Sequence, residues 1–223
     1  MKFKLLLSLL LMPLPWPLRR ALLNRLFGYQ IAPGARIGFS IVLLDGLVMR
    51  DRSRIGHLNM IKSFDRLEMG EHALIGDRNY ISGIGSRSNK HFGDEPERRP
   101  EMVIGEHAAI TGRHLIDCSN RIEIGAFATI AGAGTHILTH AISLKENRQR
   151  SGPVRIGAYC FVGAASVILK GSALPDCSVL AANSTLHQSH TEPFGLYSGV
   201  PATLARRLDP ESAYFHRKEG YVH

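Results

Sequence analysis

Residues 156–186 read IGAYCFVGAASVILKGSALPDCSVLAANSTL, with an aliphatic side chain at every sixth position. The members of this series are Ile156, Val162, Ile168, Leu174, Leu180 and Leu186. The N-terminal half has a matching series of Ile31, Ile37, Leu43, Met49, Ile55 and Ile61. A period of six differs from the 3.6-residue period of a helix and from the two-residue alternation of a sheet. It is typical of a hexapeptide solenoid, in which three short strands and their turns make up each coil.

Two other regularities share this period. A glycine often follows the aliphatic residue, as at Gly56, Gly105 and Gly163, where a tight corner needs a positive φ or a close backbone approach. A narrow prism has room for one large inward residue and one small one beside it. The small residues, four positions after the aliphatic one, are Ala73, Ala108, Ala128, Cys160, Ser166, Ser172, Ser178 and Ser184. Seven coils are predicted, beginning near Ile31, Met49, Met69, Ile104, Ile124, Ile156 and Leu174.

The chain of 223 residues has the length of one domain and carries a formal net charge of +8. Such a charge favours an anionic partner, which is a membrane surface, a phosphorylated cofactor or a nucleic acid. Because the sequence contains no recognisable nucleic-acid-binding motif, a nucleic-acid partner is not expected. The three cysteines are odd in number and lack zinc-site spacing, which fits a reducing compartment.

The segment before the repeat, residues 1–30, is apolar with basic flanks. Residues 5–18 are rich in leucine and interrupted by three prolines, and Arg19 and Arg20 follow. This run is too short to span a bilayer and lacks the cleavage site of a signal peptide, so export is the weaker interpretation. A short amphipathic helix is predicted over residues 21–27. Two compatible roles follow: the segment caps the open end of the solenoid, or it holds the chain peripherally on an anionic membrane.

Two long insertions, residues 82–102 and 139–152, interrupt the solenoid domain predicted over residues 31–190. Both leave the third face of a coil and return to the first, so we expect them to project from the same edge. Loops held on a rigid scaffold are where a site is built. Residues 191–223 are expected to form a C-terminal extension.

Two histidines lie where the second insertion starts. Strict counting places His136 inside the prism, whereas a one-residue bulge would place Ile137 there instead. His140 lies just past the last regular strand, where a side chain can face a cleft. This position makes His140 a candidate functional residue.

Three stretches, in this order and in phase with the repeat, resemble the hexapeptide-repeat acyltransferases. They are Thr139-His140, residues 153–163 (PVRIGAYCFVG) and residues 196–202 (LYSGVPA). The sequence is similar in particular to the acetyltransferases that modify bacterial surface sugars, over about residues 18–207. The resemblance implies an all-β solenoid, a left-handed parallel β-helix, that forms a homotrimer and uses acetyl-CoA.

The resemblance also implies roles for single residues. His140 corresponds to the general base that takes a proton from the acceptor hydroxyl. Residues 113–117 are similar to a stretch in which galactoside and maltose acetyltransferases carry an acceptor-binding Asn and an acid, here His114 and Asp117. His114 stands where the Asn is expected, which implies a different acceptor. By its phase it occupies a small inward position, so a locally changed backbone or a structural role is the alternative. Glu146 is a further candidate for orienting His140.

Acetyl-CoA is the cosubstrate that the resemblance implies, and no metal is expected. In this family the CoA groove runs beside the C-terminal coils. The matching small residues here are Gly163, Ala164, Ala181 and Ala182. Arg206 is predicted to meet the CoA phosphates, with Arg207 and Lys170 as alternatives.

The sequence therefore predicts an O-acetyltransferase that moves acetyl from acetyl-CoA to a hydroxyl of a saccharide. The acceptor classes expected are an exopolysaccharide, a lipopolysaccharide or a lipid-linked sugar. The expected location is the cytoplasm, with residues 1–27 in peripheral contact with the inner face of the membrane. A non-catalytic trimeric scaffold is the alternative from another class. A γ-class carbonic anhydrase shares the fold but needs three histidines on zinc, and only His136 and His140 are suitably spaced.

Overall fold

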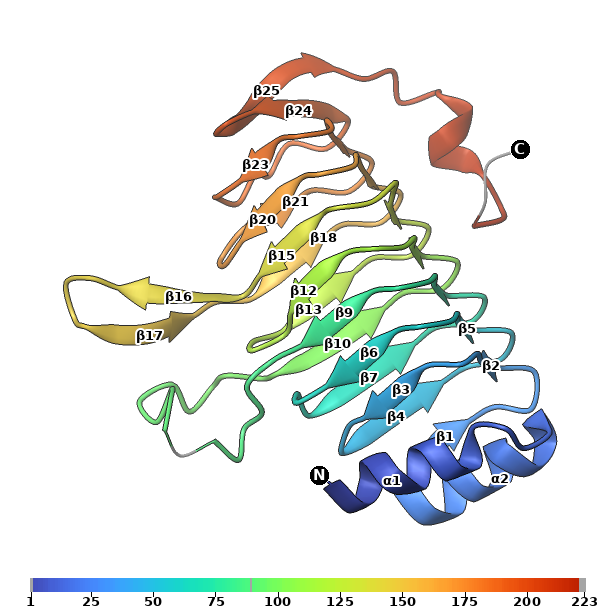
Figure 1. Ribbon diagram of the computed structural model, residues 1–223. Coiled ribbons are helices and arrows are strands. Elements are labelled where there is room, and N and C mark those ends of the chain that lie inside the picture. Colours follow the sequence, from blue (N-terminus) through green and yellow to red (C-terminus); the bar gives the residue numbers. More distant parts are fainter. Residues whose placement is uncertain (1, 89, 221–223) are drawn as a thin grey trace.

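The computed structural model describes residues 2–88 and 90–220, which form one solenoid (Figure 1). Successive strands along the chain belong to three sheets in turn, and each strand pairs with strands of the neighbouring coils. This is the parallel β-helix that the period of six predicts. Met1 of the predicted N-terminal segment, Asn89 of the first insertion and residues 221–223 of the extension lie outside the described residues.

The three sheets are defined by their strands. The first sheet contains β1 (Gln30–Ile31), β4 (Gly46–Met49), β7 (Arg66–Met69), β10 (Glu101–Ile104), β13 (Ile122–Ile124), β18 (Val154–Ile156) and β21 (Ala173–Leu174). The second contains β2 (Arg36–Ile37), β5 (Arg54–Ile55), β8 (Leu74–Ile75), β11 (Ala109–Ile110), β14 (Thr129–Ile130), β19 (Phe161–Val162), β22 (Val179–Leu180), β24 (Gly195–Gly199) and β25 (Ala202–Arg207). The third contains β3 (Ile41–Leu43), β6 (Met60–Lys62), β9 (Tyr80–Ser82), β12 (Leu115–Asp117), β15 (His136–Leu138), β20 (Val167–Leu169) and β23 (Thr185–Leu186).

The seven strands of the first sheet end at the seven residues predicted as coil starts, so the coil count is confirmed. We call the turns from the first to the second sheet the first corner, those from the second to the third sheet the second corner, and those from the third sheet back to the first the third corner. The six aliphatic residues that recur at every sixth position in residues 156–186 are at most 1% exposed. The small residues four positions after them are at most 2% exposed. The core therefore runs along the axis of the prism.

Two inward positions differ from strict counting, because two turns differ in length. In the first coil Val42 points inward and Leu43 does not, since the second-corner turn has three residues there and four in the next coil. In the fifth coil the turn has five residues, so Ile137 is buried and His136 is exposed. Gly132 and Gly134 accommodate the longer turn with φ values of 68° and 79°.

The corner glycines are required by space rather than by a positive φ. A Cβ on Gly163 would lie 2.4 Å from the backbone nitrogen of Ala182 in the next coil, and one on Gly125 would lie 2.4 Å from that of Ala158. The left-handed conformation falls instead on a later turn residue with a side chain, such as Tyr159 at 55°. Of the two reasons predicted for these glycines, close backbone approach is confirmed and the positive φ is wrong.

Two helices precede the solenoid, where one was predicted. They are α1 (Lys2–Leu11) and α2 (Trp16–Phe27), so the second helix begins five residues before the predicted start at residue 21. Pro13 and Pro15 lie in the link between the helices, and Pro17 lies in the first turn of α2, where its missing N–H is not needed. Among the described residues, no helix combines the length and apolar character needed to cross a membrane.

Helix α2 covers the first coil. Leu23 and Phe27 join the hydrophobic core together with Leu11 of α1. The buried Arg19 donates hydrogen bonds to the carbonyls of Ile37 and Gly38, at 3.2 and 3.0 Å. The predicted capping role of this segment thus has its structural basis in these contacts.

At the other end, the C-terminal residues continue the second sheet. Strand β24 pairs in parallel with β22, and β25 returns antiparallel to β24. After the 3-10 helix η1 (Ala213–His216), the chain turns back along the first corner (Figure 1), where Arg217 lies over the Tyr214 ring at 4.0 Å.

Candidate active site

Both insertions project from the third corner, as predicted (Figure 1). The first, residues 83–100, connects β9 to β10, and the second folds into a hairpin of β16 (His140–Ser143) and β17 (Arg148–Ser151). Oδ2 of Asp94 lies 2.6 Å from Nη1 of Arg150 and 3.2 Å from Nη1 of Arg148. These ion pairs join the first insertion to the hairpin.

The base of the hairpin holds a histidine–carboxylate pair. Asp117 ends β12, and His140 begins β16 one coil further along. Nδ1 of His140 lies 2.7 Å from Oδ2 of Asp117. The same carboxylate accepts hydrogen bonds from Ser119 Oγ at 2.6 Å and from the N–H and Oγ1 of Thr139 at 2.9 Å each. Four donors therefore fix the orientation of Asp117, and Asp117 in turn orients His140.

The electrostatics of this pair suit a proton acceptor. Burial alone would raise the pKa of Asp117, but the hydrogen bonds from His140, Ser119 and Thr139 outweigh it and lower the pKa below its usual range. The bond to Asp117 raises the pKa of His140 above its ordinary value, against the opposite effect of burial. Because the ionised carboxylate accepts from Nδ1–H, the lone pair of the neutral ring is on Nε2. The side chain of His140 is 29% exposed, so solvent and ligands can reach it.

Phe92 of the first insertion packs against the His140 ring. The two rings meet edge to face, with centroids 6.0 Å apart. Phe92 is buried although its φ is 62°, an unfavourable conformation for a bulky residue. The guanidinium of Arg98 lies 4.6 Å from the centroid of the Phe92 ring. Arg98 also donates to the carbonyls of Ile84, Gly85 and Ser119, so it fixes the first insertion to the coil that carries Asp117.

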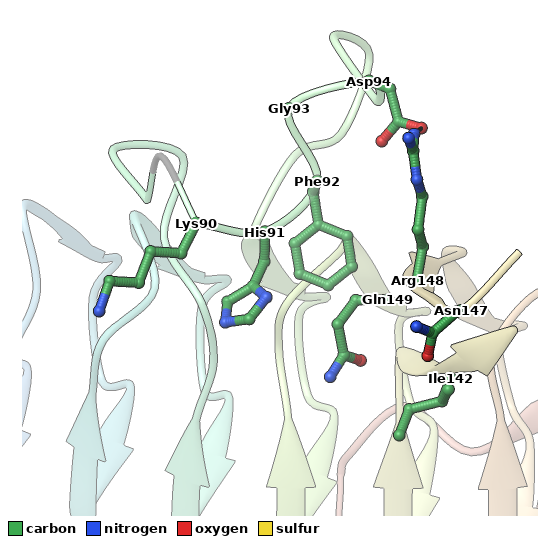
Figure 2. Close-up of a pocket in the computed structure, with 9 residues that line it drawn as sticks. All are labelled: Lys90, His91, Phe92, Gly93, Asp94, Ile142, Asn147, Arg148 and Gln149. Carbon is green, nitrogen blue, oxygen red and sulfur yellow. Dashed lines mark hydrogen bonds and ion pairs between the residues drawn. The ribbon is translucent and has the colours of Figure 1, made fainter.

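A cavity of about 620 Å³ opens between the two insertions. Figure 2 shows Lys90, His91 and Phe92 on one side of it, and Ile142 and Gln149 of the hairpin on the other. Phe92 lines this cavity and also packs on His140, so one aromatic ring lies between the cavity and the histidine–carboxylate pair. A ligand of the size of one or two sugar rings fits such a volume.

The structure decides two alternatives that the sequence left open near His140. The candidate Glu146 does not orient His140, because it pairs with Arg150 four residues along the hairpin. His136 is not inward: it is exposed on the third face, and Ile137 fills the prism instead, as in the alternative interpretation.

His114 lies inside the prism at the second corner. Its Nδ1 accepts the Thr135 N–H at 3.1 Å, and its Nε2 lies 3.0 Å from Thr111 Oγ1. The backbone N–H of His114 donates to Asn79 Oδ1 at 3.0 Å. His114 therefore continues a series of inward polar side chains that are hydrogen-bonded from coil to coil. Burial lowers the pKa of His114 to about 4, which keeps the ring neutral near neutral pH. The backbone is not locally changed, since Arg113 and Arg78 share a φ near 60° in successive coils.

The structure therefore brings Asp117 and His140 together but not His114. Strand β12 separates His114 from Asp117, a span of roughly 10 Å. The contacts of His114 favour the structural role, with the imidazole bonded to the backbone N–H of Thr135. Its contact with an acceptor stays a prediction.

The residues predicted to hold CoA lie on another corner. Gly163, Ala164, Ala181 and Ala182 belong to second-corner turns of two successive coils, at the opposite end of the third-sheet strands from His140. Ala164 lies beside Gly132 of the preceding coil. A Cβ atom added to Gly132 would lie 2.6 Å from the Cβ of Ala164, so successive coils approach closely at this corner. Arg206 is exposed on β25. Their contact with CoA stays a prediction.

Solved structures of other proteins share this fold. A hexapeptide-repeat acetyltransferase from Vibrio cholerae is similar in structure, with a TM-score of 0.55, 21% identity, and coverage of 93% of this chain and 90% of that chain. AntD, an N-acyltransferase from Bacillus cereus solved with dTDP and 3-hydroxybutyryl-CoA, gives a TM-score of 0.52 at 16% identity, over 80% and 87% of the two chains. These likenesses confirm the left-handed hexapeptide-repeat fold. No family model and no curated protein matches the sequence.

Several residues of the site were not predicted. Thr139 and Ser119 hold Asp117, and Phe92 and Arg98 place the first insertion over His140. A signal for Phe92 exists, because it is the single Phe, Tyr or Trp in residues 83–100. No pattern marks Arg98, one of several basic residues in a polar insertion. Within the described residues, no group of three His, Cys, Asp or Glu side chains is placed to hold a metal ion.

Proposed function

We propose that this protein is an acyl-CoA-dependent O-acyltransferase that moves acetyl from acetyl-CoA to a hydroxyl of a saccharide, with His140 as general base. The observation that carries the proposal is the His140–Asp117 pair, bonded at 2.7 Å beside a cavity on a hexapeptide-repeat scaffold. The acyltransferases named above, which share this fold, support acyl-CoA as the donor.

The pair accounts for the chemistry as follows. Nε2 of His140 takes the proton of the acceptor hydroxyl as its oxygen attacks the thioester carbonyl. Asp117 stabilises the imidazolium that forms, through the hydrogen bond to Nδ1. The tetrahedral intermediate then releases the CoA thiolate, which takes the proton from His140. The products are the acetyl ester and free CoA, and the base returns to its neutral form.

The position of the predicted CoA residues supports a homotrimer. Within one chain, the small residues of the second corner and His140 of the third corner lie at opposite ends of the third face. A neighbouring subunit that places its second corner beside His140 would bring the thioester to the base. We therefore propose active sites between subunits, with Gly163, Ala164, Ala181, Ala182 and Arg206 of a neighbour holding CoA.

The third face has the composition of a subunit interface. Most outward side chains of this face are apolar, namely Ile41, Leu43, Met60, Tyr80, Leu115, Leu138, Val167 and Leu169. The polar ones are Lys62, Ser82, Asp117, His136 and Thr185. Tyr80 and Leu115 are 44% and 41% exposed in the single chain. The outward positions of the first sheet include more charged side chains, for example Glu68, Glu123 and Arg155. Burying the third face against another copy would remove this apolar surface from water.

We also propose a cytoplasmic location with peripheral membrane contact through residues 1–27. Acetyl-CoA is made in that compartment, and three free cysteines fit its reducing conditions. Exposed leucines of the N-terminal helices and the net charge of +8 support the contact with an anionic surface.

Release of CoA thiol from acetyl-CoA in the presence of a panel of saccharides tests the proposal. We expect release that requires a saccharide, and we expect CoA to raise the melting temperature of the protein. His140→Ala should abolish release while retaining the CoA-induced shift. A protein that neither releases thiol nor responds to CoA would support the non-catalytic scaffold instead.

A further inference from the structure

A second cavity, of about 660 Å³, lies on the third corner between α1 and the first insertion. Lys4 of α1 borders it at one end, and Lys90 and His91 border it at the other. Lys90 and His91 also line the cavity beside His140. The two cavities therefore adjoin and form one trough along the third corner. We call it the corner trough.

The corner trough runs from the N-terminal helix to the hairpin, where Phe92 lies between it and the His140 ring. Its lining extends from Leu44 in the first coil to Ile142 of the hairpin that follows the fifth coil. Four strand spacings of the third sheet separate these coils, so the trough is roughly 19 Å long. Figure 2 shows the Lys90 side chain extended toward the N-terminal coils, away from the hairpin. It thus points along the trough rather than into solvent above the hairpin.

The trough lining carries charges of both signs, and two of its basic side chains have no ion pair among the described residues. The charged members are Asp45, Asp65, Asp94, Lys4, Arg87, Lys90 and Arg148. Lys4 and Arg87 both approach Asp45, at 3.5 and 3.6 Å. Lys90 and His91 are exposed and have no ion pair among the described residues. Both side chains line both cavities. A chemical group bound at Lys90 and His91 would therefore adjoin a ligand in the cavity near His140. An anionic group, such as a phosphate, is the ligand chemistry that two such side chains recognise.

Helix α1, at the far end of the trough, presents an apolar face without a partner. Phe3, Leu6 and Leu10 are 76%, 58% and 64% exposed, and their spacing of three and four residues places them on one face. The other face packs on the first coil through Leu11 and contacts β3. Basic side chains beside an exposed apolar face fit an anionic lipid bilayer by charge and by burial.

We propose that the corner trough binds a saccharide linked through phosphate to a membrane lipid: the lipid stays in the bilayer contacted by α1, its phosphate lies against Lys90 and His91, and its sugar reaches His140. This inference rests on the proposed acyl transfer and names its substrate class. It explains why an exposed apolar helix, an unpaired basic pair and the catalytic base share one edge of the prism.

Binding of farnesyl phosphate, a lipid phosphate without sugar, tests the trough directly in vesicles of neutral phospholipid. We expect the full-length protein to bind it, and Lys90→Glu to weaken binding by about tenfold or more, as expected for loss of a charge-assisted contact. Lys218→Glu, the same change on the exposed C-terminal segment, is the matched control and should bind like the wild type. Inorganic phosphate should compete only weakly, because it lacks the part that reaches the bilayer.

The membrane end is tested with a second pair of variants. Leu6→Glu with Leu10→Glu changes two exposed side chains and should lower partitioning into anionic vesicles by at least about tenfold. Leu204→Glu on β25, at the other end of the solenoid, should leave partitioning unchanged.

The inference is overturned if farnesyl phosphate does not bind, or if Lys90→Glu binds it as well as the wild type. Equal acetylation of soluble neutral saccharides by wild type and Lys90→Glu, with no preference for lipid-linked forms, would also overturn it. In that case saccharide-dependent thiol release would still support acyl transfer itself, so the two proposals fail separately.

Discussion

Replacing Asp117 with Asn removes one charge from the candidate site and almost none of its volume. Oδ2 of the native carboxylate accepts three of the four hydrogen bonds, from His140 and Thr139, and Oδ1 accepts the one from Ser119. The amide oxygen of Asn can take the position of Oδ2. Its NH₂ group then faces Ser119, whose hydroxyl can rotate to accept. The fold and the orientation of His140 should therefore survive the change.

The expected magnitude follows from the change in the bond to His140. A hydrogen bond to a charged group is worth about 1.5–3 kcal/mol and one between neutral groups about 0.5–1.5 kcal/mol, so the midpoints differ by about 1.3 kcal/mol. That energy corresponds to about one pKa unit and to about tenfold in rate. Since Asp117 raises the pKa of His140, Asp117→Asn should lower it.

The assay is the pH dependence of kcat/KM for acetyl transfer, between about pH 5 and pH 9. Only the neutral imidazole accepts a proton, so activity rises as pH increases through the pKa of His140. In Asp117→Asn this rise should move to lower pH by about one unit, with a plateau at most about tenfold lower. Asp209→Asn, an exposed acid near the C-terminus, should leave the profile unchanged. An unmoved profile in Asp117→Asn would refute the role assigned to the carboxylate.

Three other outcomes are expected. His140→Ala should lower kcat by about 10²–10⁴-fold and leave the CoA affinity unchanged. His136→Ala, at an exposed position, should retain activity. The reverse result would assign the base to His136. Leu115→Lys on the third face should convert the trimer to monomers in light scattering, and Glu123→Lys on the first face should not. His114→Ala should cost about 1–3 kcal/mol of unfolding free energy. Because the pKa of His114 falls from 6.5 to about 4 on folding, wild-type stability should decrease as pH falls between these values.

The fold was predictable because its signal is repeated many times. Each coil contributes aliphatic residues at the same phase, so an error at one corner leaves the others in place. The two local errors both come from the length of the second-corner turn. Compared with the four residues of the second coil, this turn has three in the first coil and five in the fifth. A one-residue change in a turn shifts which strand residue points inward, as at Val42 and Ile137. Only the Gly132 and Gly134 pair in the longer turn hinted at the second shift.

The site was predictable in its residues but not in its contacts. Asp117 and His140 are 23 residues apart in sequence and neighbours in space, because β12 and β15 pair in adjacent coils. Glu146 lies closer in sequence to His140, but the hairpin directs it toward Arg150. Sequence distance is a poor guide in a solenoid, since the residue one coil away is nearer than one several positions along a protruding loop.

The order of turns at the third corner explains how the site forms. The coil that carries Asp117 has a short turn of four residues, 118–121, between its third-sheet and first-sheet strands. The coil before it carries the first insertion, and the coil after it carries the hairpin. Two coil spacings, roughly 10 Å, separate the strands from which the insertions start.

The short turn thus forms the floor of the site, and the two insertions flank it. Ser119 in this turn bonds both to Asp117 and, through its carbonyl, to Arg98 of the first insertion. Asn120 donates to Ser151 at the base of the hairpin. The same four-residue turn therefore sets the orientation of the carboxylate and the positions of both insertions. Acceptor choice can then vary through the insertions while the His140–Asp117 pair keeps its geometry on the coils beneath.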